Sequence, residues 1–202
     1  MTHRLTVHLI IAALAVSAAI SREDANSVYN SLSSKMKNIG SISLVFSIRE
    51  NPGFRGTLKA KKGNKFIVGT PSNTIICNGK NVWNYNEAEK KVVISSYDDN
   101  SKSASVENFF FSFFKNYKPE SLQNEKNTYI LTLKPAPGNS DAQYKQVRLW
   151  AASGNLSIQK LEFDDGQRKQ TWLLKQVKLN PDLPNKLFEF TPGKGVEVID
   201  TR

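Results

Sequence analysis

Short segments in which apolar and polar side chains alternate follow one another along most of this chain, and this repeat most constrains its fold. In the first, Ile42, Leu44, Phe46 and Ile48 alternate with mostly polar neighbours, a period of two that is typical of a strand with one buried face. The other such segments are 54–60, 65–69, 74–77, 81–85, 92–95, 128–133, 145–150, 156–163, 169–177 and 187–190. Short turns such as Asn78-Gly79 separate them and leave no room for crossover helices. The sequence therefore predicts a mostly β (α+β) protein of about ten to eleven antiparallel strands.

Two other segments are predicted to be helical. Between residues 24 and 39 the apolar positions form one helical face, because they recur at spacings of four, four and three: Val28, Leu32, Met36 and Ile39. The second segment, 103–117, contains five phenylalanines in six positions, 109–111 and 113–114, and five such rings cannot all lie on one side of a helix. Either they fill a large core or some of them line a cavity for an apolar ligand.

Residues 1–21 have the pattern of a cleavable export signal. Arg4 precedes an uncharged apolar run from 5 to 20, which is shorter than the roughly 20 residues of a membrane-spanning helix. Ala19-Ile20-Ser21 is the expected cleavage site and Ala15-Val16-Ser17 the alternative. The other interpretation is an uncleaved N-terminal anchor. The mature chain, 22–202, is expected to form one exported domain, since no Pro, Ser or Gly tract divides it.

The composition of the mature chain argues against an enzyme. Both histidines lie within 1–21, so 22–202 can build no Ser-His-Asp or Cys-His centre and no His-ligated zinc site. Cys77 lies in an apolar strand, where burial raises the pKa of a thiol and makes it inert. Asp164-Asp165-Gly166 is read as a hairpin turn rather than as a pair of catalytic acids. The composition leaves one alternative open, an enzyme with a Ser-Lys nucleophile. The expected protein has no catalytic residue, metal or cofactor.

The mature chain is basic, with 27 Lys and Arg against 18 Asp and Glu and a net charge of +9. Such an excess suits nucleic acid or an anionic membrane surface, and it also aids solubility. Lys59 and Lys61, however, alternate with Leu58 and Ala60, so these lysines form a solvated face and not a stacking platform for bases. Nucleic acid is therefore not an expected partner.

Lys62 departs from this alternation. It has the same parity as Leu58 and Ala60, so its side chain is expected to point toward the apolar side of the sheet unless Gly63 introduces a bulge. A charge placed there would need a partner or a polar ligand group.

Three stretches of the chain resemble one protein family. Residues 54–66 combine a Gly-x-Leu pattern with a basic pair and a phenylalanine, 77–86 combine Asn78-Gly79 with Trp83 and Tyr85-Asn86, and 188–200 contain Phe-Thr-Pro-Gly followed by Val-Glu-Val-Ile-Asp. In this order they are similar to the outer-membrane lipoprotein carrier family, LolA, over essentially the whole mature chain.

The resemblance implies an unclosed antiparallel β-barrel whose concave face is covered by helices. The space between them would receive the acyl chains of a lipoprotein. The residues expected to line it are Leu32, Met36, Phe46, Phe66, Phe109, Phe110, Phe111 and Phe113. In the family an arginine of the basic pair contacts the helical lid; Lys62 stands at that position, with Gly63 in place of a proline, and is expected to gate the lid.

The resemblance also implies a function. The chain would be a monomeric periplasmic chaperone that takes acylated lipoproteins from an inner-membrane ABC transporter and carries them to the outer membrane, and to an acceptor there if one is present. One alternative is a periplasmic lipid-sensing regulatory domain of the same fold, which normally has an additional C-terminal domain. A lipid-anchored acceptor would need a cysteine just after the export signal, and the one cysteine is Cys77.

Overall fold

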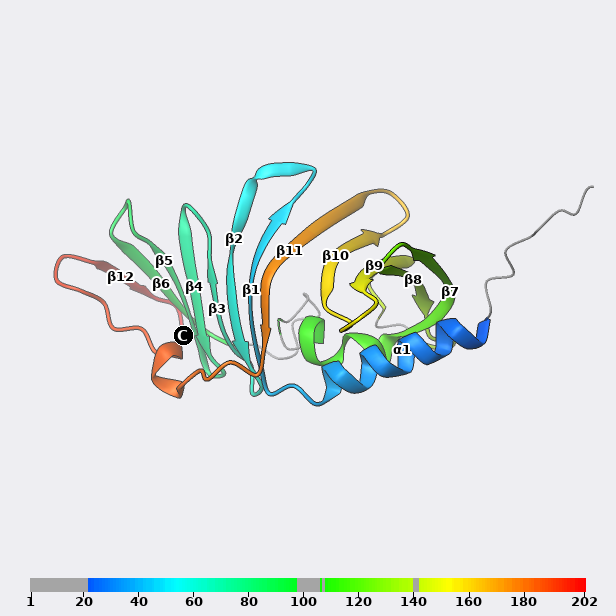
Figure 1. Ribbon diagram of the computed structural model, residues 1–202. Coiled ribbons are helices and arrows are strands. Elements are labelled where there is room, and N and C mark those ends of the chain that lie inside the picture. Colours follow the sequence, from blue (N-terminus) through cyan, green and yellow to red (C-terminus); the bar gives the residue numbers. More distant parts are fainter. Residues whose placement is uncertain (1–21, 98–105, 107, 140–141) are drawn as a thin grey trace, which may run out of the picture.

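A curved β-sheet with one helix against it makes up most of the protein (Figure 1). The structure, a computed structural model, describes residues 22–97, 106, 108–139 and 142–202. Its strands are β1 (Ser41–Ile48), β2 (Asn51–Lys61), β3 (Lys65–Gly69), β4 (Asn73–Asn78), β5 (Asn81–Asn86), β6 (Lys91–Ser96), β7 (Tyr117–Glu125), β8 (Thr128–Pro135), β9 (Gln146–Ala152), β10 (Ile158–Asp164), β11 (Lys169–Leu179) and β12 (Glu197–Asp200). The helical segments are α1 (Arg22–Lys37), η1 (Asn108–Ser112), η2 (Phe113–Asn116) and η3 (Asn185–Phe188).

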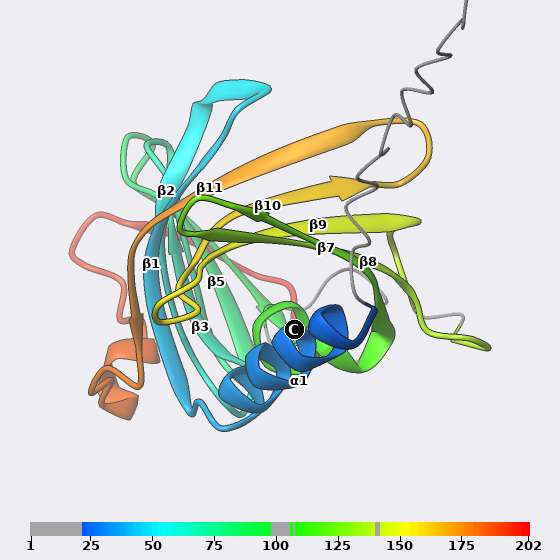
Figure 2. The same cartoon turned by 45° about the vertical axis from the view of Figure 1, so that its right-hand side comes forward.

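All twelve of these strands belong to one sheet, in the order β12-β6-β5-β4-β3-β2-β1-β11-β10-β9-β8-β7. Tight turns join most neighbours, and these pairs are antiparallel as predicted. β12 differs because it runs parallel to β6. Since β12 and β7 stand at opposite ends of the order, the sheet curves without closing (Figure 2). The mostly β fold with an unclosed barrel is therefore confirmed, with twelve strands where about ten to eleven were expected.

The alternation in the sequence places the core on the concave face of this sheet. In β1, the alternating residues Ile42, Leu44, Phe46 and Ile48 are all buried. In β2, Leu58 and Ala60 are buried while Lys59 between them is exposed. The predicted solvated face of β2 is confirmed.

Helix α1 lies against the end of the sheet formed by β7 and β8, and it also contacts η1 (Figures 1 and 2). Its predicted apolar face is confirmed: Leu32 and Met36 are buried, as is Ile39 just beyond the helix, and Val28 packs partly buried against the same core. The helix buries this stripe because an amphipathic helix is stable in water mainly through such packing.

The convex face carries a second, smaller apolar cluster under the C-terminal segment. Ile76, Trp83, Val92 and Ile94 form it. Phe190 and Val196, which follow η3, pack against them, with the Phe190 ring 5.1 Å from that of Tyr85. The C-terminal segment thus covers the back of the sheet, opposite the face that holds α1.

Three local predictions were wrong. The predicted strand 187–190 is a 3-10 turn followed by irregular chain, with Phe188 fully buried. In place of one helix over 103–117, the described part has the π-helical turn η1, the 3-10 turn η2 and the start of β7. β7 and β12 were not predicted at all. Residues 103–105 and 107 lie outside the described residues.

No helix among the described residues is long and apolar enough to cross a membrane. The expected export signal, 1–21, lies outside them.

Candidate functional site

A cavity of about 220 Å³ lies between the concave face and the helical segments that cover it. The sheet contributes Ile42, Leu44, Leu149, Ile158, Leu161, Leu174, Val177 and Leu179. The opposite wall consists of Lys35, Met36, Phe110, Phe113 and Phe114, and the β9–β10 turn adds Asn155, Leu156 and Ser157. Almost the whole wall is apolar, so the cavity suits hydrocarbon better than a polar ligand.

A β-bulge in β11 shapes the sheet side of the cavity. Leu174, Val177 and Leu179 all line it, although a regular strand would place residues 174 and 177 on opposite faces. Between them, the pairing of β11 with β1 slips by one residue, and Gln176 has a positive φ of 51°. The extra residue restores Val177 to the concave face, which is what a bulge does to a strand.

Tyr29 ties helix α1 to the other half of the cover. Its hydroxyl lies 2.6 Å from the carbonyl oxygen of Phe114 and 2.9 Å from that of Tyr117, and donates to this pair. The rings of Tyr29 and Phe114 also meet edge to face at 5.6 Å. Burial raises the pKa of Tyr29, so the hydroxyl keeps its proton. We call α1 together with η1 and η2 the lid, because these contacts join them into one unit.

The residues predicted to line the cavity fall into three groups. Met36, Phe110 and Phe113 do so. Leu32, Phe46 and Phe111 are buried in the core outside the cavity wall, and Phe66 is half-buried against that core. Phe109 belongs to η1, but its side chain lies outside the described residues.

Phe46 belongs instead to a row of aromatic rings farther along the concave face. Its ring centroid lies 6.0 Å from that of Phe54 and 5.5 Å from that of Trp172, and Trp172 in turn lies 6.3 Å from Phe163. Phe163 is 1% exposed and Phe54 42% exposed, so the row runs from the core to the surface.

Lys62 points to the side of the sheet that carries α1, as its parity predicted, but it lies at the exposed rim and not among apolar side chains. β2 ends at Lys61, whose Nζ donates to the carbonyl oxygen of Leu183 on the opposite side of the sheet from α1. The amide of Lys62 still donates to the carbonyl oxygen of Gly40 at 2.9 Å, so the alternation continues through Lys62 and ends at the turn with positive φ at Gly63 and Asn64. The side chain of Lys62 is exposed, and its Nζ donates to the carbonyl oxygen of Lys37 at 3.0 Å. Lys62 thus contacts the last turn of α1 from outside the cavity.

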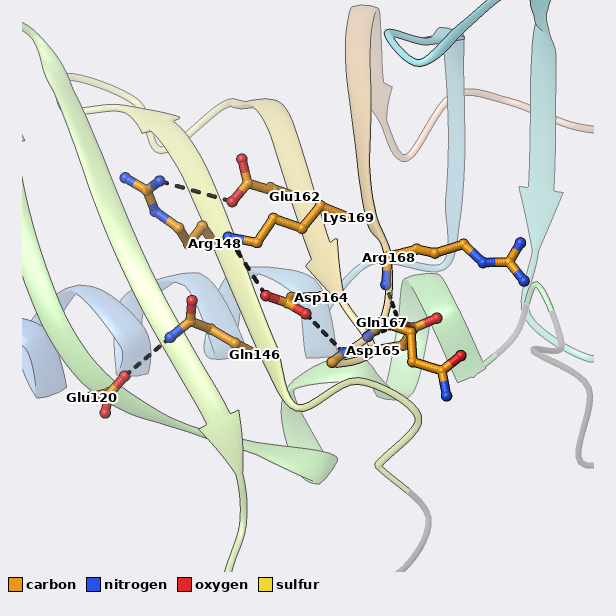
Figure 3. Close-up of polar contacts among 10 residues, drawn as sticks. Glu120, Gln146, Arg148, Glu162, Asp164, Asp165, Gln167, Arg168 and Lys169 are labelled. Atoms are coloured by element: carbon orange, nitrogen blue, oxygen red, sulfur yellow. Dashed lines mark hydrogen bonds and ion pairs between the residues drawn. The ribbon is translucent and has the colours of Figure 1, made fainter.

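The outer face of the sheet is polar around β9, β10 and β11 (Figure 3). Arg148 pairs with Glu162 at 3.8 Å, and Lys169 with Asp164 at 3.6 Å. Asp164 also accepts from the amide of Gly166, while Asp165 accepts from the amides of Gln167 and Arg168, and those hydrogen bonds lower the pKa of Asp165. The hairpin interpretation of these two acids is confirmed, since their carboxylates hold the turn.

Cys77 and the possible metal ligands were the remaining candidates for chemistry. Cys77 is fully buried and burial raises the pKa of its thiol, as predicted. Among the described residues no group of His, Cys, Asp and Glu could hold a metal ion.

Most of the cavity wall was missed by sequence reasoning. Phe114, the β9–β10 turn and the sheet residues were not predicted, although the alternation that buries Ile42 and Leu44 was recognised. The signal for the sheet residues was present in the strand pattern, but only the pairing of β1 with β11 and the bulge bring them to one place.

Comparisons with known proteins agree with this architecture. The outer-membrane lipoprotein carrier protein of Neisseria meningitidis serogroup C is 27% identical over 206 aligned positions, which cover 98% of this chain and 97% of that protein. The protein of the same name from Nitrosomonas europaea is 25% identical over 128 positions, 62% of this chain and 61% of its own. Among solved structures, an uncharacterized conserved protein from Thermus thermophilus matches with a TM-score of 0.55 and 14% identity, covering 88% of this chain and 99% of that one.

A family model decides the assignment. The model described as outer membrane lipoprotein carrier protein LolA matches residues 47–191. This span includes every strand from β2 to β11 and the η1 and η2 part of the lid. The chain belongs to the LolA family of outer membrane lipoprotein carriers.

Proposed function

We propose that the protein is a periplasmic chaperone that shields the acyl chains of lipoproteins on their way from the inner to the outer membrane. The apolar cavity under the lid carries this proposal. Each CH₂ group kept from water is worth about 0.8 kcal/mol, so acyl chains need such a wall to cross an aqueous compartment. Family membership and the relatives named as lipoprotein carriers support the same cargo.

In the proposed cycle, residues 1–21 direct export and are removed, and 22–202 works as a single monomeric domain. An inner-membrane ABC transporter supplies the acylated lipoprotein, and the outer membrane, or an acceptor on it, receives it. Neither catalysis, a cofactor nor nucleic acid has a part in this cycle.

Loading requires the lid to move. The cavity of about 220 Å³ is smaller than the roughly 300–1,000 Å³ of pockets that hold drug-sized ligands. Several acyl chains therefore fit only if α1, η1 and η2 move away from the sheet. η1 and η2 are short π and 3-10 turns, which are held by weaker hydrogen-bond geometry than an α-helix, and Tyr29 couples α1 to them.

Lys62 is the proposed gate of this lid. The carbonyl of Lys37 is among the last four of α1, which have no partner inside the helix. The ammonium group of Lys62 supplies one at 3.0 Å and also meets the negative end of the helix dipole. Lys62 thereby stabilises the closed position.

Replacing Lys62 with alanine is expected to speed exchange of a bound ligand about two- to fivefold, because a cation at a helix C-terminus contributes about 0.3–1 kcal/mol. The dissociation rate of the neutral fluorophore Nile red, measured by stopped flow, checks this. Lys59→Ala is the matched control, since Lys59 is an exposed lysine of β2, three residues before Lys62, and faces away from the lid. An unchanged dissociation rate in Lys62→Ala would remove the gating role.

The proposed cargo is tested with one lipoprotein in two forms, lipidated and unlipidated. The purified protein is expected to bind Nile red, and the lipidated form alone is expected to displace it. Equal displacement by both forms, or by neither, would reject acyl-chain binding. Adding the protein to spheroplasts then separates a carrier, which releases lipoproteins into the medium, from a sensor of the same fold, which would bind them without releasing them.

A further inference from the structure

We propose that the cavity selects amphiphiles with an anionic headgroup, and that Lys35 at its open end binds that headgroup. This inference rests on the proposed function, because it takes an acyl chain as the occupant of the cavity. It adds which headgroup the site prefers.

The polar groups of the cavity wall are gathered at one end. Lys35 comes from the C-terminal half of α1, and Asn155 and Ser157 from the β9–β10 turn. Lys35 Nζ donates to the carbonyl oxygen of Asn155 at 2.6 Å, which brings the two segments together. Asn155 is exposed and Lys35 half-exposed, so this end of the cavity meets solvent, while Leu149, Leu161 and Leu174 form its interior.

The charge at the open end of the cavity is positive and comes from Lys35. Among the described residues, Lys35 is the sole ionisable side chain in the cavity wall, and no Asp or Glu of that part of the chain lies within ion-pair distance of it. An ammonium group has three donors, and one of them is directed at the Asn155 carbonyl oxygen. Two donors are left for the region where a headgroup would sit.

The geometry matches an amphiphile that enters with its chain inward. An apolar cavity of about 150 Å³ holds benzene, so the space of about 220 Å³ takes a segment of one alkyl chain even with the lid closed. The headgroup then lies beside Lys35, the Asn155 amide and the Ser157 hydroxyl. A carboxylate or phosphate there gains a charge-assisted hydrogen bond, which is roughly twice as strong as a neutral one. A neutral glyceryl group gains only the weaker bonds.

Three ligands with the same oleoyl chain test the proposal by displacement of Nile red: oleate, oleoyl lysophosphatidic acid and monoolein. For the unaltered protein, at least one of the anionic lipids is expected to bind about tenfold more tightly than monoolein, and whichever does so identifies carboxylate or phosphate as the preferred group. Raising the salt concentration should narrow the difference, because a partly exposed ion pair is screened.

Variants at Lys35 separate the headgroup contact from the fit of the chain. Lys35→Met is expected to weaken the anionic lipid about tenfold and monoolein by less than about threefold, because monoolein loses only a weaker, neutral hydrogen bond. Lys35→Arg is expected to retain the preference. Lys37→Met is the matched control, because Lys37 is exposed on the same helix and outside the cavity wall. Equal binding of all three lipids by the unaltered protein, or equal weakening of all three in Lys35→Met, would overturn the anionic preference and leave acyl-chain binding intact. Failure of every lipid to displace Nile red would instead reject the proposed function itself.

Discussion

Replacing Phe163 with alanine is expected to lower the free energy of unfolding by about 3–5 kcal/mol, the usual cost of truncating a buried phenylalanine. The side chain is 1% exposed, and its ring lies 4.7 Å from that of Tyr144 and 6.3 Å from that of Trp172. Its removal leaves a cavity in the closely packed part of the concave face. Since small domains are stable by only about 5–15 kcal/mol, this variant should be close to the limit of folding. Urea unfolding followed by tryptophan fluorescence measures the change.

Phe54→Ala is the control for this experiment, because it removes the same ring from the exposed end of the same aromatic row. Phe54 is 42% exposed and contacts the row through Phe46, so a loss of less than about 1 kcal/mol is expected for a largely solvated site. Similar losses in both variants would contradict a row that runs from packed core to surface.

The sequence predicts the sheet well where strands bury one face and poorly where they do not. β1 and β2 alternate clearly because their inner side chains enter the core. β7 forms one end of the sheet and carries Pro119 and several exposed polar residues, and β12, at the other end, has no buried side chain. Strands at sheet edges bury little, so they leave no apolar period to detect.

The sequence predicted which segments cover the cavity, but not the secondary structure that the phenylalanine-rich one adopts. A run of phenylalanines indicated either a large core or a cavity wall, and the structure shows both, with Phe111 in the core and Phe113 at the cavity. The run has no helical period, and it forms a π-helical turn followed by a 3-10 turn. Those two turns distribute the rings in a way that a single regular helix would not.

The alternation of apolar and polar residues does not predict where a side chain lies next to a strand end or a β-bulge. The parity of Lys62 predicts the correct side of the sheet, but it does not predict that the residue lies at the exposed rim, one position beyond the end of β2. Gly63 and Asn64 tolerate the positive φ of the turn that follows, but they do not reveal at which residue the strand ends. The bulge at Gln176 in β11, which returns Val177 to the cavity, was likewise not predicted. Glutamine rarely adopts a positive φ, so its residue type carries no signal for the bulge.

Val177→Phe is expected to fill the cavity without destabilising the fold. Val177 is a half-buried residue of the cavity wall. The larger phenylalanine ring therefore enters the empty cavity and does not overpack the core. The free energy of unfolding should therefore stay within about 1 kcal/mol of the original value. Nile red affinity should fall about tenfold, equivalent to about 1.4 kcal/mol, because the added ring occupies space that the ligand needs. Urea unfolding and fluorescence titration measure the two quantities.

Val147→Phe makes the same substitution in close-packed core. Val147 is fully buried on the concave face, and it is outside the cavity wall. Overpacking there should cost about 1–3 kcal/mol of stability while the protein that remains folded keeps its affinity for Nile red. Val177→Phe should therefore lose affinity for Nile red and keep its stability, while Val147→Phe should lose stability and keep its affinity. If Val177→Phe were the less stable of the two, or bound Nile red as the unaltered protein does, the space beside Val177 would be ordinary core and not the site that receives acyl chains.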